Sequence, residues 1–129
     1  MAWLAPTGTP LVPPKVARVQ LPAGGSAAKE AQAFLGDGVQ VVSAFQNVAA
    51  DLLQDETSRI DCDVLVCGNK REAREAVVKL AEAAGLKAWH AGPIDNSAAA
   101  EALTSVLIFI NRNGGVDHAG IRITGEQKT

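Results

Sequence analysis

Residues 62–91, CDVLVCGNKREAREAVVKLAEAAGLKAWHA, decide the fold because they contain a complete strand–helix–strand unit. The run Cys62–Cys67 is apolar and is closed by Gly68, which is typical of a buried strand. A helical pattern follows over residues 69–84, and Leu86–Ala91 is a second strand. Strand, helix and strand in this order favour parallel pairing with a right-handed crossover.

The helix expected over residues 69–84 is amphipathic. Asn69 can cap its first turn, and Gly85 can end it in the left-handed conformation that glycine adopts readily. Its apolar residues recur at helical spacing and form a stripe that is expected to cover the strands. The stripe comprises Ala73, Ala76, Val77, Leu80 and Ala84.

Toward the N-terminus, another helix and strand precede this unit. Ser26 is a suitable N-cap for a helix over residues 27–35, and Gly36 is a suitable residue to end it. Val39–Phe45 is dense in β-branched residues and is therefore expected to be a largely buried strand.

The remaining segments complete the expected α/β fold. Residues 1–14 are rich in Pro, Gly and Thr and are expected to be irregular, while Asn47 can cap a short helix as far as Leu53. A longer helix is expected over residues 97–112, with a short terminal strand over Ile121–Thr124. The chain is thus expected to hold about three parallel strands, flanking helices and a long apolar C-terminal helix.

The C-terminal helix poses a problem for a sheet this small. Residues Leu103–Ile110 are apolar on nearly every side, and a helix of that kind must be covered on several faces. A parallel sheet likewise needs cover on both of its faces. The pattern leaves two explanations open: the chain dimerises through this helix, or part of a larger sheet is missing.

Composition narrows the class of protein. The 129 residues are 47% hydrophobic and 20% charged with a net charge of -2, which excludes a disordered chain and argues against unassisted nucleic-acid binding. The start lacks a secretory signal and no apolar run is long enough to span a bilayer, so the cytoplasm is the expected compartment. Cys62 and Cys67 are too few for a disulfide scaffold or a zinc site, and His90 and His118 are too isolated to suggest a metal.

Candidate chemistry is confined to the ends of the strands. Neither a glycine-rich phosphate loop nor the H-E-x-x-H and G-x-S-x-G motifs occur in the sequence. Gln46 and Asn47 follow a strand, and their amides suit the carbonyl and N–H edge of a planar heterocycle, although Asn47 serves equally well as a helix cap. Lys15 and Arg18 are candidates to meet an anionic tail of such a ligand, or simply exposed cations.

A resemblance to a known family rests on seven segments that occur in one order. They are PLVPPKVA (10–17), GSAAKEA (25–31), VVSAF (41–45), DVLVCG (63–68), AGPIDNS (91–97), EAL (101–103) and GIRITG (120–125). Together they resemble the NADPH:coenzyme F420 (deazaflavin) oxidoreductase family over residues 10–125. Residues 1–9 are then an irregular lead without a match, and residues 126–129 a tail.

The resemblance implies an oxidoreductase that transfers hydride between NADP(H) and coenzyme F420. Family members begin with a Rossmann half that carries the glycine-rich loop, and this chain resembles only the C-terminal portion. The resemblance therefore implies a partial Rossmann-like fold without the NADP-binding loop, and a chain that is weak or inactive alone. The alternative is a non-catalytic deazaflavin-binding or dimerisation module that acts with a full-length partner.

The resemblance also assigns residues to the coenzyme. It places the loop Phe45, Gln46, Asn47, Val48 and Ala49 against the deazaflavin ring, and the segment Pro10, Leu11 and Val12 beside the same cleft. It assigns no catalytic residue and no metal. Relatives often have His where Gln46 stands, and unlike His the Gln side chain cannot change its charge near neutral pH. The family is dimeric, which implies a homodimer through the helix near Leu103–Ile110.

Overall fold

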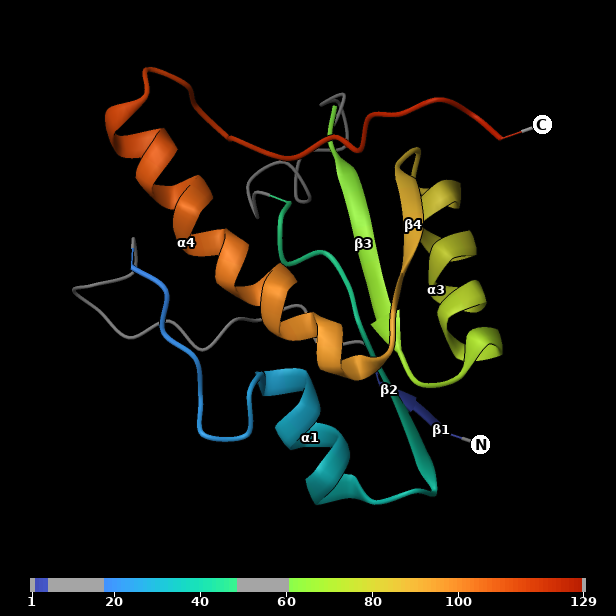
Figure 1. The fold of residues 1–129 in the computed structure, drawn as a ribbon. Helices are drawn as coiled ribbons and strands as arrows, with labels where there is room; N and C mark the ends of the chain where they lie inside the picture. The colour runs from blue at the N-terminus through green and yellow to red at the C-terminus, as the bar shows by residue number, and fades with distance from the viewer. Residues whose placement is uncertain (1, 5–17, 49–60, 129) are drawn as a thin grey trace.

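The computed structural model describes residues 2–4, 18–48 and 61–128 of the chain, with only the backbone given for residues 2–4. A mixed sheet in the order β1-β2-β3-β4 is flanked by helices (Figure 1). The strands are β1 (Ala2–Leu4), β2 (Val39–Ser43), β3 (Asp63–Gly68) and β4 (Lys87–Gly92). The helices are α1 (Ala27–Leu35), α3 (Arg71–Ala83), the 3-10 turn η1 (Ile94–Asn96) and α4 (Ser97–Asn113).

The β3–α3–β4 unit confirms the strand–helix–strand prediction. Strands β3 and β4 pair in parallel from Asp63 opposite Lys87 onward, and Gly85 has the expected positive φ of 85° after α3. The expected cap at Asn69 is wrong, because Lys70 occupies that position. The Asn69 side chain instead accepts a hydrogen bond of 3.0 Å from the backbone N–H of Ile94.

The buried face of α3 is rotated from the predicted stripe. Leu80 is 62% exposed, although the pattern placed it on the apolar face, while Val78 and Ala81 are buried. Residues follow one another at about 100° around a helix, so an arc that includes Val78 leaves Leu80 at its rim. The sequence alone does not reveal this rotation because both positions hold apolar residues.

The direction of β2 differs from the prediction of parallel strands. Strand β2 runs antiparallel to β3, with Val42 opposite Gly68 and Ser43 opposite Cys67. Strand β1, in a segment predicted to be irregular, pairs in parallel with β2 over Val39–Val41. The carboxyl end of β2 therefore points toward the amino end of β3, away from the edge where β3 and β4 both end.

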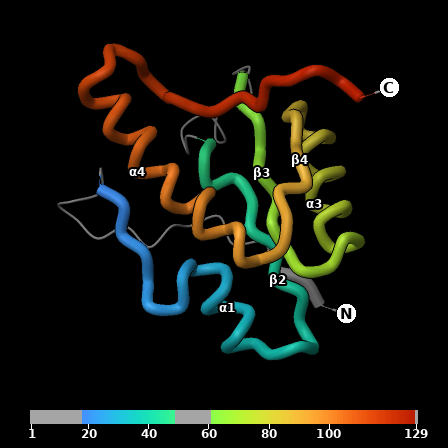
Figure 2. The backbone as a smooth tube through the Cα atoms, viewed as in Figure 1, coloured from blue at the N-terminus to red at the C-terminus, as the bar shows by residue number. Residues whose placement is uncertain are grey.

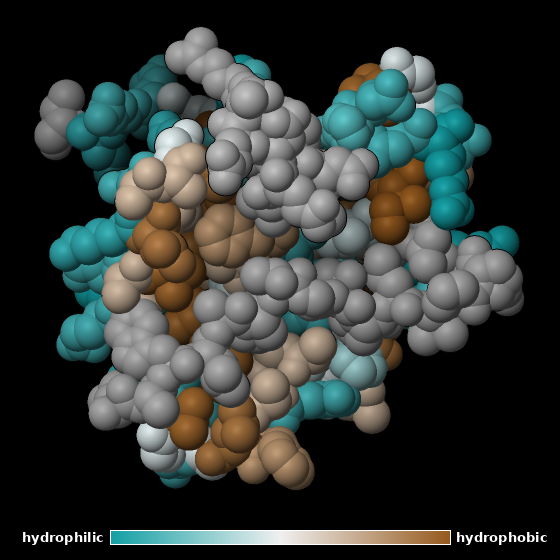
Figure 3. Space-filling model, turned by 180° about the vertical axis from the view of Figure 1, so that it is seen from behind, coloured by the Kyte–Doolittle hydropathy of each residue, from teal (hydrophilic) through white to brown (hydrophobic). Residues whose placement is uncertain are grey.

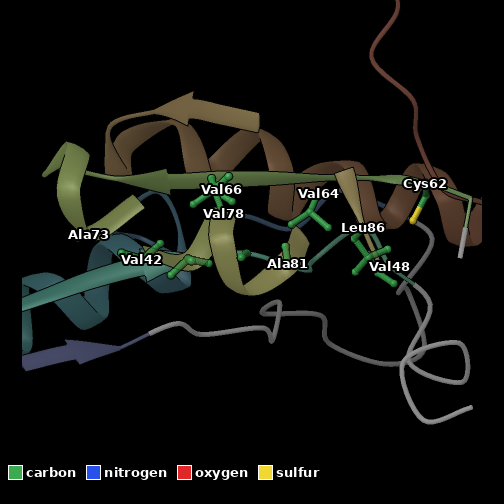
Figure 4. Close-up of a cluster of buried hydrophobic side chains, with 11 residues drawn as sticks. Val42, Val48, Cys62, Val64, Val66, Ala73, Val78, Ala81 and Leu86 are labelled. Carbon is green, nitrogen blue, oxygen red and sulfur yellow. The ribbon is translucent and has the colours of Figure 1, made fainter. Parts of the chain in front are cut away.

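Alternating residues of the strands send side chains to opposite faces of the sheet, as strand geometry requires. On one face Val42, Val64 and Val66 pack with α3 in a cluster that also includes Val48, Cys62 and Leu86 (Figure 4). On the other face Val41 packs with Ala28 of α1 and Ile94 of η1. Helices thus cover both faces of the sheet.

Helix α1 agrees with its predicted bounds and is held at its start by α4. Ser26 caps it as expected, with its Oγ accepting from the N–H of Lys29 at 3.0 Å. The buried carboxylate of Glu101, on α4, accepts from the N–H groups of Ala27 at 2.7 Å and Ala28 at 3.3 Å. An anionic group at a helix N-terminus satisfies free donors and favours the helix dipole. Glu101 therefore joins the two helices.

The outer side of α4 carries exposed apolar residues, as the sequence predicted for this helix. Val106, Phe109 and Ile110 are exposed, and their spacing puts them on one side of the helix. From behind, Figure 3 shows hydrophobic surface in several separate areas among hydrophilic surface. In the described part of the chain, no helix is both long and apolar enough to cross a membrane.

The C-terminal segment forms no strand, contrary to the expectation for Ile121–Thr124. It nevertheless lies in contact with the sheet, because the carbonyl of Ile121 accepts from the N–H of Asp63 at 2.8 Å. Cys62 and Cys67 are both free and buried, in agreement with their expected place at a buried strand.

We expect Glu101→Ala to lower the free energy of unfolding by about 2–4 kcal/mol, because it leaves N–H groups at the start of α1 without their charged acceptor. Urea unfolding measures this loss. Glu82→Ala, at an exposed position of α3, is the matched control and should change stability by less than about 0.5 kcal/mol. Equal effects of the two substitutions would contradict the assigned role of Glu101.

Candidate functional site

The loop that follows β2 turns sharply over Phe45–Val48. The N–H of Val48 donates to the carbonyl of Phe45 at 3.3 Å, which closes the turn. Phe45 has a φ of 66°, in the left-handed region that bulky residues rarely adopt. Strained backbone of this kind persists only where the surroundings hold it, and it is concentrated at functional sites.

Helix α4 holds this loop from one side through two hydrogen bonds. The side chain Nδ2 of Asn47 donates to the carbonyl of Ala100 at 2.9 Å. The hydroxyl of Thr104 donates to the carbonyl of Gln46, also at 2.9 Å. Asn47 is therefore a structural anchor for the loop, and the helix that it was expected to cap lies largely outside the described residues.

Gln46 differs from Asn47 because one polar atom of its side chain makes no hydrogen bond within the described residues. Its Nε2 donates to the hydroxyl of Ser43 at 2.7 Å, but its Oε1 has no hydrogen-bond partner within the described residues. The residue is only 6% exposed, so water does not freely satisfy this oxygen. A buried acceptor without a partner is costly in a folded protein, and it is one of the features by which an empty binding position can be recognised.

The other predicted site residues divide into two groups. Ala49, the segment Pro10, Leu11 and Val12, and Lys15 lie outside the described residues. Arg18 is described and exposed, and its carbonyl accepts from the hydroxyl of Ser105 on α4 at 3.0 Å.

The ends of β3 and β4 do not join the loop after β2. Because β2 is antiparallel to β3, the Gly68–Asn69 turn and the Gly92–Pro93 turn lie at the opposite edge of the sheet. The bond from Ile94 to Asn69 connects these two turns directly. The prediction of parallel strands would have brought these turns and the Gln46–Asn47 loop to the same end of the sheet, and the antiparallel direction of β2 shows that it is wrong.

A buried carboxylate at the amino end of β3 was missed by the sequence reading. Asp63 is 6% exposed, and its Oδ2 accepts from Trp89 Nε1 at 2.9 Å and from the N–H of Ile123 at 2.8 Å. Burial by itself raises the pKa of Asp63, but these hydrogen bonds and the charges of Lys87 and Arg122 outweigh burial and lower the pKa below its ordinary value. Asp63 is therefore ionised in the folded protein at neutral pH.

Trp89 and Ile123, the hydrogen-bond partners of this carboxylate, line an open cavity. Its volume is about 740 Å³, and its lining includes Lys87, Trp89 and residues 123–128. The ammonium group of Lys87 lies 4.6 Å from the centre of the Trp89 ring, a cation–π arrangement. The sequence pattern did not predict that residues 123–128 lie beside β4, because the two segments are far apart along the chain.

The cysteines near this region are not suited to nucleophilic chemistry. Burial raises the pKa of Cys67 to about 11, an effect that Arg74 opposes and Glu101 reinforces. Burial and the neighbouring Asp63 and Asp61 also raise the pKa of Cys62. The thiolate is the reactive form, so both thiols are inert at neutral pH. Among the described residues, no group of His, Cys, Asp and Glu side chains could hold a metal ion.

Comparison with known proteins gives consistent relatives. The chain is 41% identical over 111 residues to the F420-dependent NADP reductase of Methanocaldococcus jannaschii, covering 85% of this chain and 49% of that protein. It is 40% identical over 102 residues to the F420-dependent NADP reductases of Methanothermobacter marburgensis and Methanothermobacter thermautotrophicus, covering 78% of this chain and 46% and 44% of those proteins. The chain thus spans about half the length of the relatives it matches.

A solved structure shares the fold. A crystal structure from Arthrobacter sp. FB24, of a protein named as a candidate F420-dependent NADP-reductase, matches with a TM-score of 0.78 and 24% identity over 95% of this chain and 57% of that one. No family model matches the chain. The resemblance inferred from the sequence is confirmed, since the relatives that match most of this chain are named F420-dependent NADP reductases.

The lowered pKa of Asp63 predicts how stability depends on pH. At neutral pH the carboxyl is ionised in both the folded and the unfolded chain, so its contribution is fully present. Below the ordinary pKa of 3.8 the unfolded chain binds the proton first, and the contribution is lost as the pH falls through the lower folded pKa. We expect Asp63→Asn to cost about 1–3 kcal/mol at pH 7 and much less at pH 2.5.

Urea unfolding of the wild type and the variant at the two pH values measures this difference. Asp37→Asn, at an exposed aspartate, is the control and should show little effect at either pH. A difference between wild type and Asp63→Asn that stays constant with pH would contradict the assignment.

Proposed function

We propose that this chain supplies the deazaflavin-facing half of an oxidoreductase that transfers hydride between NADP(H) and coenzyme F420. The names of the relatives support the two cofactors, and the shared length supports a half. The observation that carries the assignment within the structure is the buried Oε1 of Gln46, an acceptor without a described partner in a strained loop. The resemblance assigns this same loop to the deazaflavin ring.

The chemistry of the ring suits this acceptor. A deazaflavin carries an N–H group between two carbonyls at one edge, and Gln46 Oε1 would accept a hydrogen bond from that N–H. Coenzyme F420 and NADP supply the hydride chemistry when they are bound, so the chain needs only to bind and orient the ring. The loop is suited to this role because Asn47 and Thr104 fix it to α4.

The small exposure of Gln46 adds a condition to binding. Its Oε1 is almost completely enclosed, so a ligand can reach it only when the surrounding residues move. Hydrogen bonding then replaces an unsatisfied polar group by a satisfied one, which favours the bound state. In this proposal Phe45 and Val48 border the ring together with Ala49, and Pro10, Leu11 and Val12 lie beside the same cleft.

The nucleotide side of the reaction is proposed to reside elsewhere. The sequence has no glycine-rich loop that could bind the pyrophosphate of NADP, and it spans only about half of each relative. We infer a partial Rossmann-like fold and a chain that turns over slowly or not at all when it is alone. A second chain, or a longer form of this one, would provide the missing half.

A homodimer is proposed through the outer side of α4. Val106, Phe109 and Ile110 are exposed on this helix, and a second copy would remove them from water. Burial of large apolar side chains is the main favourable term in stable protein association. The interface would lie near Leu103–Ile110, as the sequence suggested.

A second candidate function keeps the coenzyme but not the reaction. The chain is then a deazaflavin-binding or dimerisation module that acts with a full-length partner. The anchored loop with its unpartnered Gln46 Oε1 supports this alternative as well, because binding the ring requires no further group. Addition of NADPH and oxidised coenzyme F420 separates the two: loss of absorbance with turnover supports the enzyme, and binding without turnover supports the module.

We expect the wild-type chain to bind coenzyme F420 and Gln46→Leu to bind it about tenfold more weakly, because the leucine cannot accept the hydrogen bond. Gln46→His should retain binding, because a neutral imidazole can still accept a hydrogen bond through one ring nitrogen. Fluorescence titration of the coenzyme measures the affinities. The matched control is Gln127→Leu at an exposed position, which should leave the affinity unchanged. Undiminished binding by Gln46→Leu would exclude Oε1 as a ligand contact.

The proposed dimer predicts a distinct response to charge. We expect Phe109→Glu to convert a dimer into a monomer in analytical ultracentrifugation, because the interface would bury an unpaired charge. Phe34→Glu is the matched control, since Phe34 is 90% exposed on α1 and lies outside the proposed interface. A dimer that survives Phe109→Glu, or a monomeric wild type, would overturn this part of the proposal.

A further inference from the structure

The C-terminal segment returns from the end of α4 to the sheet and forms a strap, defined here as residues 119–125. Figure 2 shows this segment, in red, passing across the start of β3 and on toward β4. The strap is tied at its beginning to α4, because the N–H of Ala119 donates to Asn111 Oδ1 at 2.8 Å. Further contacts with β3 follow along its length.

Asp63 fastens the strap to the sheet with two hydrogen bonds, one from its backbone and one to its side chain. The N–H of Asp63 donates to the carbonyl of Ile121, and Asp63 Oδ2 accepts from the N–H of Ile123, both at 2.8 Å. The side chain of Arg122 also pairs with the exposed carboxylate of Asp61. Trp89 holds the same Oδ2 from the side of β4 at 2.9 Å. The buried carboxylate is thus the common partner of the strap and β4.

The strap passes close to Asn47 of the loop that follows β2 and is packed on the start of β3. A Cβ placed on Gly120 would lie 2.6 Å from Cys62 Cβ and 3.9 Å from the carbonyl oxygen of Asn47. The backbone at Gly120 is therefore packed so closely on the start of β3 that no side chain fits there. The loop is thus bonded to α4 through Asn47 and Thr104, and Gly120 of the strap is close to the same Asn47.

We propose that Asp63 is a positioning residue for coenzyme binding: by fastening the strap it holds the 45–48 loop in its strained conformation. This inference rests on the proposed function of that loop. Asp63 itself touches the strap and Trp89, and acts on the coenzyme only through the loop. A loop held in place before binding costs less conformational entropy when the ligand arrives, which strengthens affinity.

The test compares two substitutions of Ile123 in the strap, of which only one removes the hydrogen bond to Asp63. Ile123→Pro removes the N–H that donates to Asp63, whereas Ile123→Ala keeps that N–H and removes most of the side chain. Asp63→Ala removes the acceptor itself. Ala73→Gly, in α3 and distant from the loop in Figure 4, is the control for a general loss of stability. Each variant is measured by amide hydrogen exchange of a peptide that covers residues 44–48 and by titration with coenzyme F420.

We expect the amide hydrogens of the 44–48 peptide to exchange about tenfold faster in Ile123→Pro and in Asp63→Ala than in the wild type. This factor corresponds to one lost hydrogen bond to a charged group. Their affinity for coenzyme F420 should fall by a similar factor. Ile123→Ala and Ala73→Gly should match the wild type in both measurements.

The other outcomes separate this inference from the proposed function. Unchanged exchange in both Ile123→Pro and Asp63→Ala overturns the positioning role, whether or not coenzyme F420 binds. Faster exchange with unchanged affinity overturns the role in binding. If the two variants exchange faster but the wild-type chain itself binds no coenzyme F420, the action of Asp63 on the loop is supported and the proposed function is overturned.

Discussion

The antiparallel pairing of β2 with β3 determines where the candidate site lies. The pairing of Val42 with Gly68 and of Ser43 with Cys67 turns the end of β2 toward the start of β3. The loop over residues 45–48 consequently lies beside Cys62 and the strap, and within reach of α4. In a parallel arrangement the same loop would lie at the opposite end of β3, near Asn69 and Pro93, and would be removed from its present hydrogen bonds to Ala100 and Thr104 of α4.

Buried polar groups connect the elements around this pairing. Glu101 joins α4 to α1, Asp63 joins β3 to β4 and the strap, and Asn47 joins the loop to α4. Each of these groups is costly to bury alone, and each has partners that offset the cost. Gln46 is different, because one side of its amide is satisfied and the other is not. This contrast is the basis for the proposal that Gln46 contacts a ligand, whereas the other three groups complete the fold.

Local patterns predicted the elements of the structure better than their arrangement. The helix from Ala27 to Leu35 was predicted to the residue, because Ser26 and Gly36 mark its ends by their own backbone chemistry. The direction of β2 was not, since the connection between Phe45 and Cys62 is long enough for either direction. The site shows the same division between local pattern and arrangement. Gln46 and Asn47 were identified from their place after a strand, but their partners were not. The partners Ala100, Thr104 and Asp63 depend on contacts between distant segments that no periodicity records.

A chain that spans half of its relatives can still hold this loop, because the contacts that shape it come from the chain itself. Its anchors are on α4, its neighbour is the strap, and its packing is on β3 and α3. The described chain also leaves Phe34 of α1 and the outer residues of α4 exposed. The described contacts of the loop are therefore internal to this chain, whereas these apolar side chains face outward. Under the proposed function, such a chain would hold the coenzyme through its own loop and would depend on association for the rest of the reaction.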